Sequence, residues 1–133
     1  MLTQMSIRNF ALIEQMNISF NDGITIFTGE TGAGKSILMD AFSILLGERA
    51  SSEFIRHGKD SFVIDGIFDI ANHQSLLDLL QSKNILVEDN QLILSRSFNT
   101  SGKSIILAND QPIPLKALKE IGLLLADIHG QYS

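Results

Sequence analysis

One segment of eight residues limits the folds open to this chain more than any other feature. It reads Gly29-Glu30-Thr31-Gly32-Ala33-Gly34-Lys35-Ser36 and fits the pattern G-x-x-x-x-G-K-[ST] at every fixed position. A nearly continuous apolar and β-branched run at residues 24–28 precedes it, and apolar residues at helical spacing follow it. The sequence therefore predicts a buried strand at 24–28, a glycine-rich loop, and a helix over about 35–46 that ends at Gly47.

The residue types in this loop suit the binding of a nucleoside triphosphate. Its glycines let the backbone curl so that successive N–H groups point at the β-phosphate, and the start of the helix adds its dipole. Lys35 is expected to bridge oxygens of the β- and γ-phosphates, and the Ser36 hydroxyl to be a ligand of Mg²⁺. The predicted nucleotide-binding residues are Gly29, Glu30, Thr31, Gly32, Ala33, Gly34, Lys35 and Ser36.

Composition narrows the class of protein further. The 133 residues suit one domain, and an apolar content of 44% is enough for a hydrophobic core. No signal peptide is visible, and the uncharged apolar runs are far shorter than the roughly 20 residues that span a bilayer. The absence of cysteine excludes a disulfide scaffold, a thiolate zinc site and a cysteine nucleophile. A net charge of −5 argues against the chain alone coating a nucleic acid, so we expect a soluble cytoplasmic protein without a membrane partner.

The rest of the chain predicts an α/β fold, with an antiparallel β-section packed beside a partial parallel core sheet. Asn72 is expected to be the N-cap of a helix, and the continuous apolar run 123–128 is interpreted as a second fully buried strand beside 24–28. Gly102-Lys103-Ser104 repeats the end of the loop motif, but the spacing fails and we interpret it as a hairpin turn. Besides the elements at 24–28 and 35–46, the expected strands are 2–8, 14–20, 62–68, 91–98, 103–108 and 123–128, and the expected helices are 73–81 and 115–121.

A second candidate part of the nucleotide site lies near the end of the sequence. The motif D-x-x-G-Q occurs there as Asp127-Ile128-His129-Gly130-Gln131. In a GTPase-like switch, Asp127 would bind Mg²⁺ and Gln131 would orient the attacking water. Alternatively, the strand delivers Gln131 as the Q-loop glutamine of an ABC-type ATPase, whose Walker B acid lies outside this chain. The 90 residues between Ser36 and Asp127 and the lack of an N-K-x-D motif favour the second interpretation.

Several stretches spread over the whole chain resemble one family. They are Leu2 to Ile13 (LTQMSIRNFALI), Gly29 to Asp40 (GETGAGKSILMD), Arg56-His57-Gly58, the hairpin with Arg96, Gly102-Lys103-Ser104 and Asn109, and the terminal DIHGQ. Together they resemble the RecN family of bacterial DNA repair proteins, which are SMC-like members of the ABC ATPases. The resemblance implies the fold of a P-loop NTPase head of the ABC/SMC type, and it implies that residues 1–133 are its N-terminal lobe, with the coiled coil and the C-terminal lobe absent.

The resemblance also implies roles for individual residues. Residues 29–36 would bind ATP and Mg²⁺, with Ser36 and Gln131 near the metal and Lys35 and Gln131 as the catalytic residues. Arg8-Asn9-Phe10 lies where related heads contact the nucleotide. The implied partners are the C-terminal half of the same head, a second head that engages on ATP binding as a homodimer, and DNA through the complete protein. The expected location is the bacterial cytoplasm, on the nucleoid during repair, and the isolated chain is expected to hydrolyse almost no ATP.

Two other functions stay open at this point: the self-contained GTPase-like switch, and a non-catalytic module that docks through an open sheet edge. For Arg56 we favour a solvated loop arginine over a phosphate or DNA contact. For Arg96 and Lys103 we favour a charged strand face over a DNA-facing edge. His57 and His129 are interpreted as packing or orienting residues at least as readily as ligand contacts.

Overall fold

A computed structural model of the chain describes residues 1–20 and 32–129, and all of their side chains except those of 32–35 and 129. None of the described helices is long and apolar enough to cross a membrane. The elements, in chain order, are β1 (Leu2–Phe10), β2 (Ile13–Ser19), α1 (Gly32–Leu45), a short 3₁₀ helix (Ser52–Phe54), β3 (Ser61–Asp69), α2 (Gln74–Ser82), β4 (Gln91–Asn99), β5 (Ser104–Ala108), β6 (Gln111–Pro112) and α3 (Leu115–His129).

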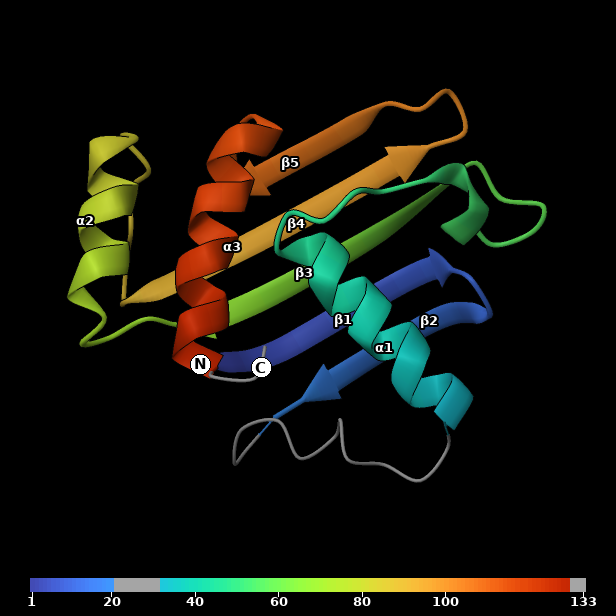
Figure 1. Ribbon diagram of the computed structural model, residues 1–133, viewed down its shortest axis with the longest axis horizontal. Coiled ribbons are helices and arrows are strands. Elements are labelled where there is room, and N and C mark those ends of the chain that lie inside the picture. Colours follow the sequence, from blue (N-terminus) through green and yellow to red (C-terminus); the bar gives the residue numbers. More distant parts are fainter. Residues whose placement is uncertain (21–31, 130–133) are drawn as a thin grey trace.

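Within the described residues, one sheet contains six strands in the order β2-β1-β3-β4-β5-β6 (Figure 1). Every pair of neighbours in it is antiparallel, and Gly66 at the centre of β3 lies between Met5 of β1 and Leu94 of β4. The predicted antiparallel β-section is therefore confirmed, including the hairpin whose turn holds Gly102 at a φ of +83°. The predicted strand 24–28 lies outside the described residues.

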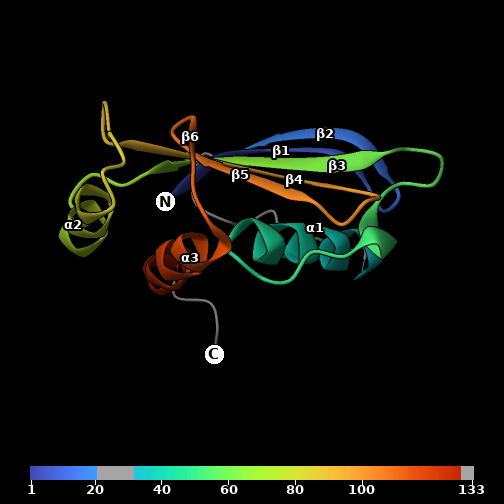
Figure 2. The ribbon, with the colours of Figure 1, turned by 90° about the horizontal axis from the view of Figure 1, so that it is seen from above.

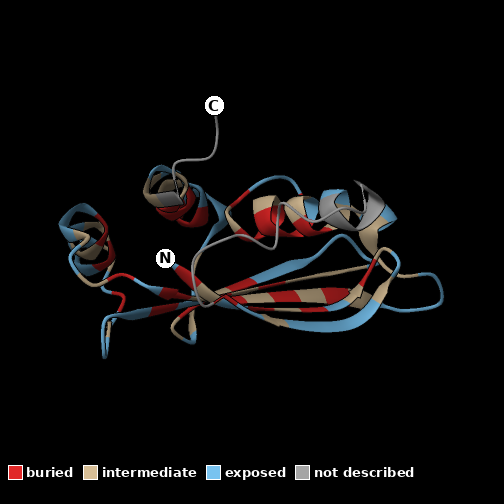
Figure 3. Ribbon diagram, turned by 90° about the horizontal axis from the view of Figure 1, so that it is seen from below, coloured by how far each residue is buried: buried red, intermediate tan, exposed pale blue. Residues whose placement is uncertain are grey.

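The helices α1 and α3 lie on one face of this sheet, and α2 lies beside its end (Figure 2). Burial follows the same division, because strand positions alternate between the face toward the helices and the open face (Figure 3). In β3 the buried series is Phe62, Ile64, Gly66 and Phe68, which is the period of two that a half-covered sheet requires. The core thus fills the layer between this face of the sheet and the helices.

The prediction of a buried strand at 123–128 is wrong, because these residues form the second half of α3. Leu118, Ile121 and Leu125 are fully buried at helical spacing, whereas Leu123 within the apolar run is 71% exposed. An apolar run of this length is compatible with a buried strand or with a buried helix, and periodicity inside the run does not separate the two. The decisive pattern is set by residues before the run, which start the helix at Leu115.

The helix ends differ from expectation in two places. α1 begins at Gly32, inside the loop motif, and is followed by Gly47 at a φ of +115°, the left-handed conformation expected of a helix stop. The predicted N-cap Asn72 is wrong. His73 occupies the cap position of α2 without a side-chain capping hydrogen bond, and Asn72 adopts a φ of +68° in the turn before it.

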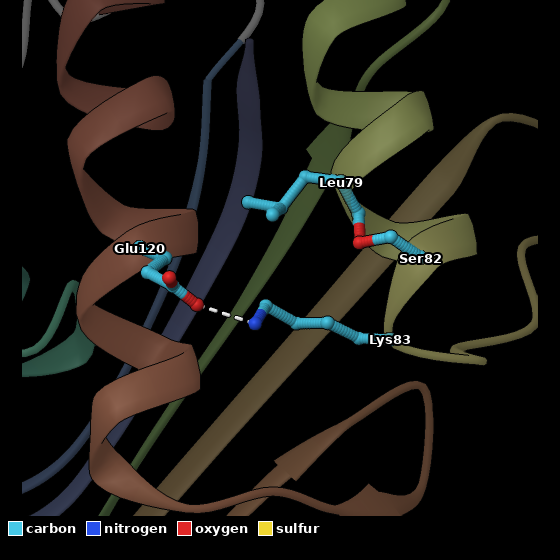
Figure 4. Close-up of polar contacts among 4 residues, drawn as sticks. All are labelled: Leu79, Ser82, Lys83 and Glu120. Atoms are coloured by element: carbon cyan, nitrogen blue, oxygen red, sulfur yellow. Dashed lines mark hydrogen bonds and ion pairs between the residues drawn. The ribbon is translucent and has the colours of Figure 1, made fainter.

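An ion pair connects the two helices that flank the end of the sheet. Lys83, which follows α2, pairs with Glu120 of α3, and Ser82 beside it donates a hydrogen bond of 2.7 Å to the carbonyl of Leu79 (Figure 4). The side chains of Lys83 and Glu120 are 24% and 44% exposed, so solvent screens the pair. The hydrogen bond and the charge of Lys83 lower the pKa of the Glu120 carboxyl.

α3 approaches the turn after α1 closely at Gly122. A Cβ at this position would lie 1.8 Å from the carbonyl oxygen of Leu46, in the turn that ends α1. Nearby, a Cβ on Gly47 would lie 3.1 Å from the Cα of Lys119. The two helices therefore meet through their backbones, and Gly122 is the residue type that this crossing requires.

Replacing Gly122 with alanine is expected to destabilise the fold. Alanine favours a helix over glycine by about 1 kcal/mol, whereas a methyl group pressed against the backbone of another helix costs about 3 kcal/mol or more. We expect the free energy of unfolding to fall by about 2 kcal/mol net, measured by urea denaturation. Leu123→Ala, at the exposed neighbouring position, is the control and should change it by less than about 0.5 kcal/mol. An unchanged urea midpoint for Gly122→Ala would contradict the tight crossing.

The ion pair predicts a pH dependence of stability. Because the pKa of Glu120 is lowered in the folded state, the pair stabilises the fold above the ordinary carboxyl pKa of about 4.3, and this contribution is lost as the pH falls through the lowered value. Glu120→Gln should therefore be less stable than the parent at neutral pH, with the difference closing in acid. Urea midpoints at several pH values measure this, with Glu88→Gln in an exposed loop as the control. A difference that persists unchanged in acid would show that the charge of Glu120 is not responsible.

Candidate nucleotide-binding site

The predicted phosphate-binding loop straddles the boundary of the described residues. Gly29, Glu30 and Thr31 lie outside them, whereas Gly32 to Ser36 form the first turn and more of α1. The first N–H groups of any α-helix lack intrahelical partners and, with the helix dipole, favour an anion. A helix that begins within the motif therefore offers the geometry that a phosphate needs. Ser36, the first of these residues whose side chain is described, is exposed, so its hydroxyl is open to a ligand.

The body of α1 is fixed to the sheet by a buried apolar stripe. Its fully buried residues are Ala41, Phe42 and Leu45, and Leu38 and Ile44 are nearly as buried. Leu45 packs over the centre of β3, where a Cβ on Gly66 would lie 2.6 Å from its Cδ2 atom. This glycine leaves room for the Leu45 side chain against the strand, and together with the buried stripe it gives the element that begins in the loop motif a defined position on the sheet.

Arg96 of β4 is not on a charged strand face, and the interpretation of it as such is wrong. It is 2% exposed, and its Nη1 donates to the carbonyls of Ile44 at 2.6 Å and Glu48 at 2.5 Å. Burial lowers the pKa of its guanidinium, which nevertheless stays protonated in proteins. The available signal was the alternation of β4, since Leu92, Leu94 and Arg96 fall on one face. Lys103, by contrast, is exposed beside the hairpin turn.

Arg56 joins the segment after α1 to the turn between β1 and β2. Its Nη1 donates to the carbonyl of Leu12 at 2.7 Å, and its backbone N–H donates to the carbonyl of Asn9 at 2.9 Å. The backbone N–H of Ala11 donates to the carbonyl of Phe54 at 2.6 Å. The ring of Phe54 stacks on the ring of Phe10, with 5.0 Å between the ring centroids. Arg56 is thus a half-buried loop residue, and its side chain is bonded to this turn.

The residues that the family resemblance places near the nucleotide divide between surface and core. Arg8 is exposed and Asn9 is half-buried at a φ of +56°, whereas Phe10 is fully buried. Phe10 therefore supports the turn from within rather than presenting its ring to a ligand. His57 is exposed, which leaves it without the packing role considered for it.

The second candidate part of the site has a different structural setting from the one predicted. Asp127 lies on an exposed position of α3, and His129 is the last residue of that helix. The interpretation of Asp127 as a metal ligand at the end of a buried strand is wrong, because no strand is there. Gln131 lies outside the described residues, two positions after the helix ends. The start of α1 and the end of α3 both lie toward the β1–β2 side of the sheet, but at opposite ends of its strands (Figure 1).

An open groove of about 560 Å³ lies at the junction of α3 with the C-terminal end of α1, beside their contact at Gly122. Leu46 and Leu123 form part of its apolar lining, and Arg49 and Lys119 add charge. Ser36, the one residue of the motif whose side chain is described, does not line it. Within the described residues the groove is therefore a feature of the helix junction.

In this chain a glycine-rich motif leads into α1, and α1 packs beside α3 on one face of an antiparallel sheet. This combination is typical of the heads of P-loop ATPases. The chain belongs to the AAA domain family, whose sequence profile matches residues 4–110. Membership of this family implies nucleotide binding. The chain is also 45% identical over 132 residues to the DNA repair protein RecN of Bacillus subtilis (strain 168). The aligned residues make up 99% of this chain and 23% of that protein. It corresponds to the N-terminal part of such relatives and spans about 23% of their length.

Solved structures agree on the fold. An SMC ATPase described for its ATP-driven dimerisation and DNA-stimulated activation superposes with a TM-score of 0.70 at 16% identity, covering 92% of this chain and 78% of that one. The recombination mediator protein RecF gives a TM-score of 0.62 at 18% identity, covering 91% of this chain and 29% of that one. The predicted fold of an ABC/SMC-type head is confirmed, and none of these relatives supports the GTPase-like interpretation.

Asp127 provides a direct test of the corrected geometry. Because it lies on the exposed face of a helix, Asp127→Asn should leave the affinity for Mg²⁺-nucleotide within about twofold of the parent. Titration calorimetry measures this, with Asp78→Asn on the exposed side of α2 as the matched control. Loss of Mg²⁺-dependent binding in the Asp127 variant alone would restore the D-x-x-G-Q interpretation.

Proposed function

We propose that residues 1–133 form the ATP-binding N-terminal lobe of a RecN-like ATPase head that acts in the repair of DNA breaks. The observation that carries the proposal is the loop motif that opens at Gly32 into α1, a helix fixed to the sheet by buried residues. The 45% identity to a DNA repair protein over nearly the whole chain supports the biological role. The likeness to an SMC ATPase and to RecF supports the head architecture.

In this proposal, residues 29–36 hold the triphosphate through backbone N–H groups and the start of α1. Lys35 neutralises charge on the β- and γ-phosphates, and the exposed Ser36 hydroxyl is a ligand of Mg²⁺. Mg²⁺ held by Ser36 would supply Lewis-acid stabilisation of the charge that develops on the phosphates in hydrolysis. Gln131, two positions after α3 in the sequence, would act on the metal and the attacking water.

The partners follow from what the chain does not itself provide. A complete head needs a Walker B acid and a signature motif, and neither stretch occurs in these 133 residues. We infer that a C-terminal lobe of the same protein supplies them, and that a second head closes over the γ-phosphate when ATP is bound. Hydrolysis removes the bridging phosphate and releases the heads. DNA is contacted by the complete protein, in the bacterial cytoplasm and on the nucleoid.

The binding half of this proposal is tested by Lys35→Ala. Removing a cation from the β- and γ-phosphates is expected to weaken Mg²⁺-ATP binding by about tenfold or more. Titration of the protein with a fluorescent ATP analogue measures the affinity, and Lys59→Ala, an exposed lysine outside the motif, is the control. Equal affinities for the Lys35 variant and the parent, or a preference for GTP, would refute ATP binding at this loop.

The need for a partner lobe gives a separate expectation for catalysis. The 133-residue chain alone should bind ATP weakly and turn it over far more slowly than about 1 per second, the lower range of ordinary enzymes. A phosphate-release assay on the purified chain measures this. Turnover at about 1 per second or faster would show that the chain contains a complete catalytic site.

A further inference from the structure

Arg96 is a buried cation whose hydrogen-bond partners are backbone carbonyls of another element. Its guanidinium donates to Ile44 and Glu48, the carbonyls that flank the turn after α1. Among the described residues no carboxylate pairs with it, and its Nε has no hydrogen-bond partner. Its negative counterpart is therefore the C-terminal end of α1, where the helix dipole places partial negative charge.

The surroundings of Arg96 do not require an arginine for packing. In the sheet it lies between Ile64 of β3 and Ile106 of β5, which are 0% and 6% exposed. At a position flanked in this way, an apolar side chain of similar size often gives equal or greater stability than a buried charge. Core packing alone therefore does not explain why this residue is an arginine. What an arginine adds is the two hydrogen bonds to the end of α1.

The end of α1 is held from a second side as well. Gly122 of α3 contacts the carbonyl of Leu46, which lies between the two carbonyls that Arg96 binds. The last turn of α1 is therefore clamped between a strand of the sheet and a second helix. Because a helix of 14 residues is a stiff rod about 20 Å long, a displacement at this end is carried to the other.

We propose that Arg96 is a positioning residue for nucleotide binding: by fixing the C-terminal end of α1, it sets where the start of α1 presents the loop motif. This inference rests on the proposed function, since it assumes that residues 29–36 bind ATP. It assigns to a β4 residue outside the motif a share of the affinity for the triphosphate.

The experiment compares three variants of the intact protein in Mg²⁺-ATP titrations and in urea denaturation. Arg96→Met removes both hydrogen bonds while keeping an apolar volume, and Arg96→Lys keeps a cation that can reach a carbonyl. Leu94→Ala is the matched control, because Leu94 is buried on the same face of the same strand. Should Arg96→Met not fold, the comparison of Arg96→Lys with Leu94→Ala decides the question.

We expect Arg96→Met to weaken ATP binding by about fivefold or more, whereas Leu94→Ala changes it by less than about twofold despite an equal or larger loss of stability. Arg96→Lys should recover part of the affinity. An affinity for Arg96→Met equal to that of the parent, or losses of affinity in all variants that simply follow their losses of stability, would overturn the positioning role.

Two further arms separate this inference from the proposed function. If the parent does not bind ATP, or if Lys35→Ala binds as well as the parent, the proposed function fails and the positioning role fails with it. If the parent binds and Lys35→Ala does not, while Arg96→Met still binds like the parent, ATP binding stands and the positioning role alone is refuted.

Discussion

Leu45 lies so close to Gly66 that a Cβ on the glycine would sit 2.6 Å from the leucine side chain, and this contact brings α1 onto the centre of the sheet. The other parts of the described core are arranged around it. Arg96 reaches the end of the same helix from β4, and α3 crosses that end at Gly122. The antiparallel sheet thus serves as a platform on which one helix is fixed by a close approach, a buried cation and a backbone crossing.

Much of this fold could be predicted from the sequence, and the reason is local. Short apolar, β-branched segments bounded by turn residues are local patterns, so β1, β3 and β4 could be predicted close to their observed bounds. The region 123–128 was not, because a run of consecutive apolar residues has no period to measure. Its assignment to α3 depends on Leu118 and Ile121, which lie before the run and continue the same buried stripe.

The site divides in a similar way. The loop motif is a local pattern, and the helix expected to follow it is present as α1, which begins at Gly32. Arg96 was misjudged because a charged residue on a strand is usually on the open face. Its burial depends on carbonyls 48 and 52 residues away in the chain, which no local pattern contains. Likewise, the contact of Arg56 with Leu12 joins segments that only the folded chain brings together.

A loop that binds phosphate faces a conflict between rigidity and access. Its N–H groups must stay free for the ligand, so it cannot be made rigid by packing side chains against it. Order must therefore be supplied from elsewhere, and the helix that leaves the loop is the element through which it can arrive. In this protein, α1 is buried along its body by Phe42 and Leu45 and clamped at its end by Arg96 and Gly122. If residues 29–36 bind ATP as proposed, the end of α1 opposite the loop helps to hold the loop ready for the phosphates.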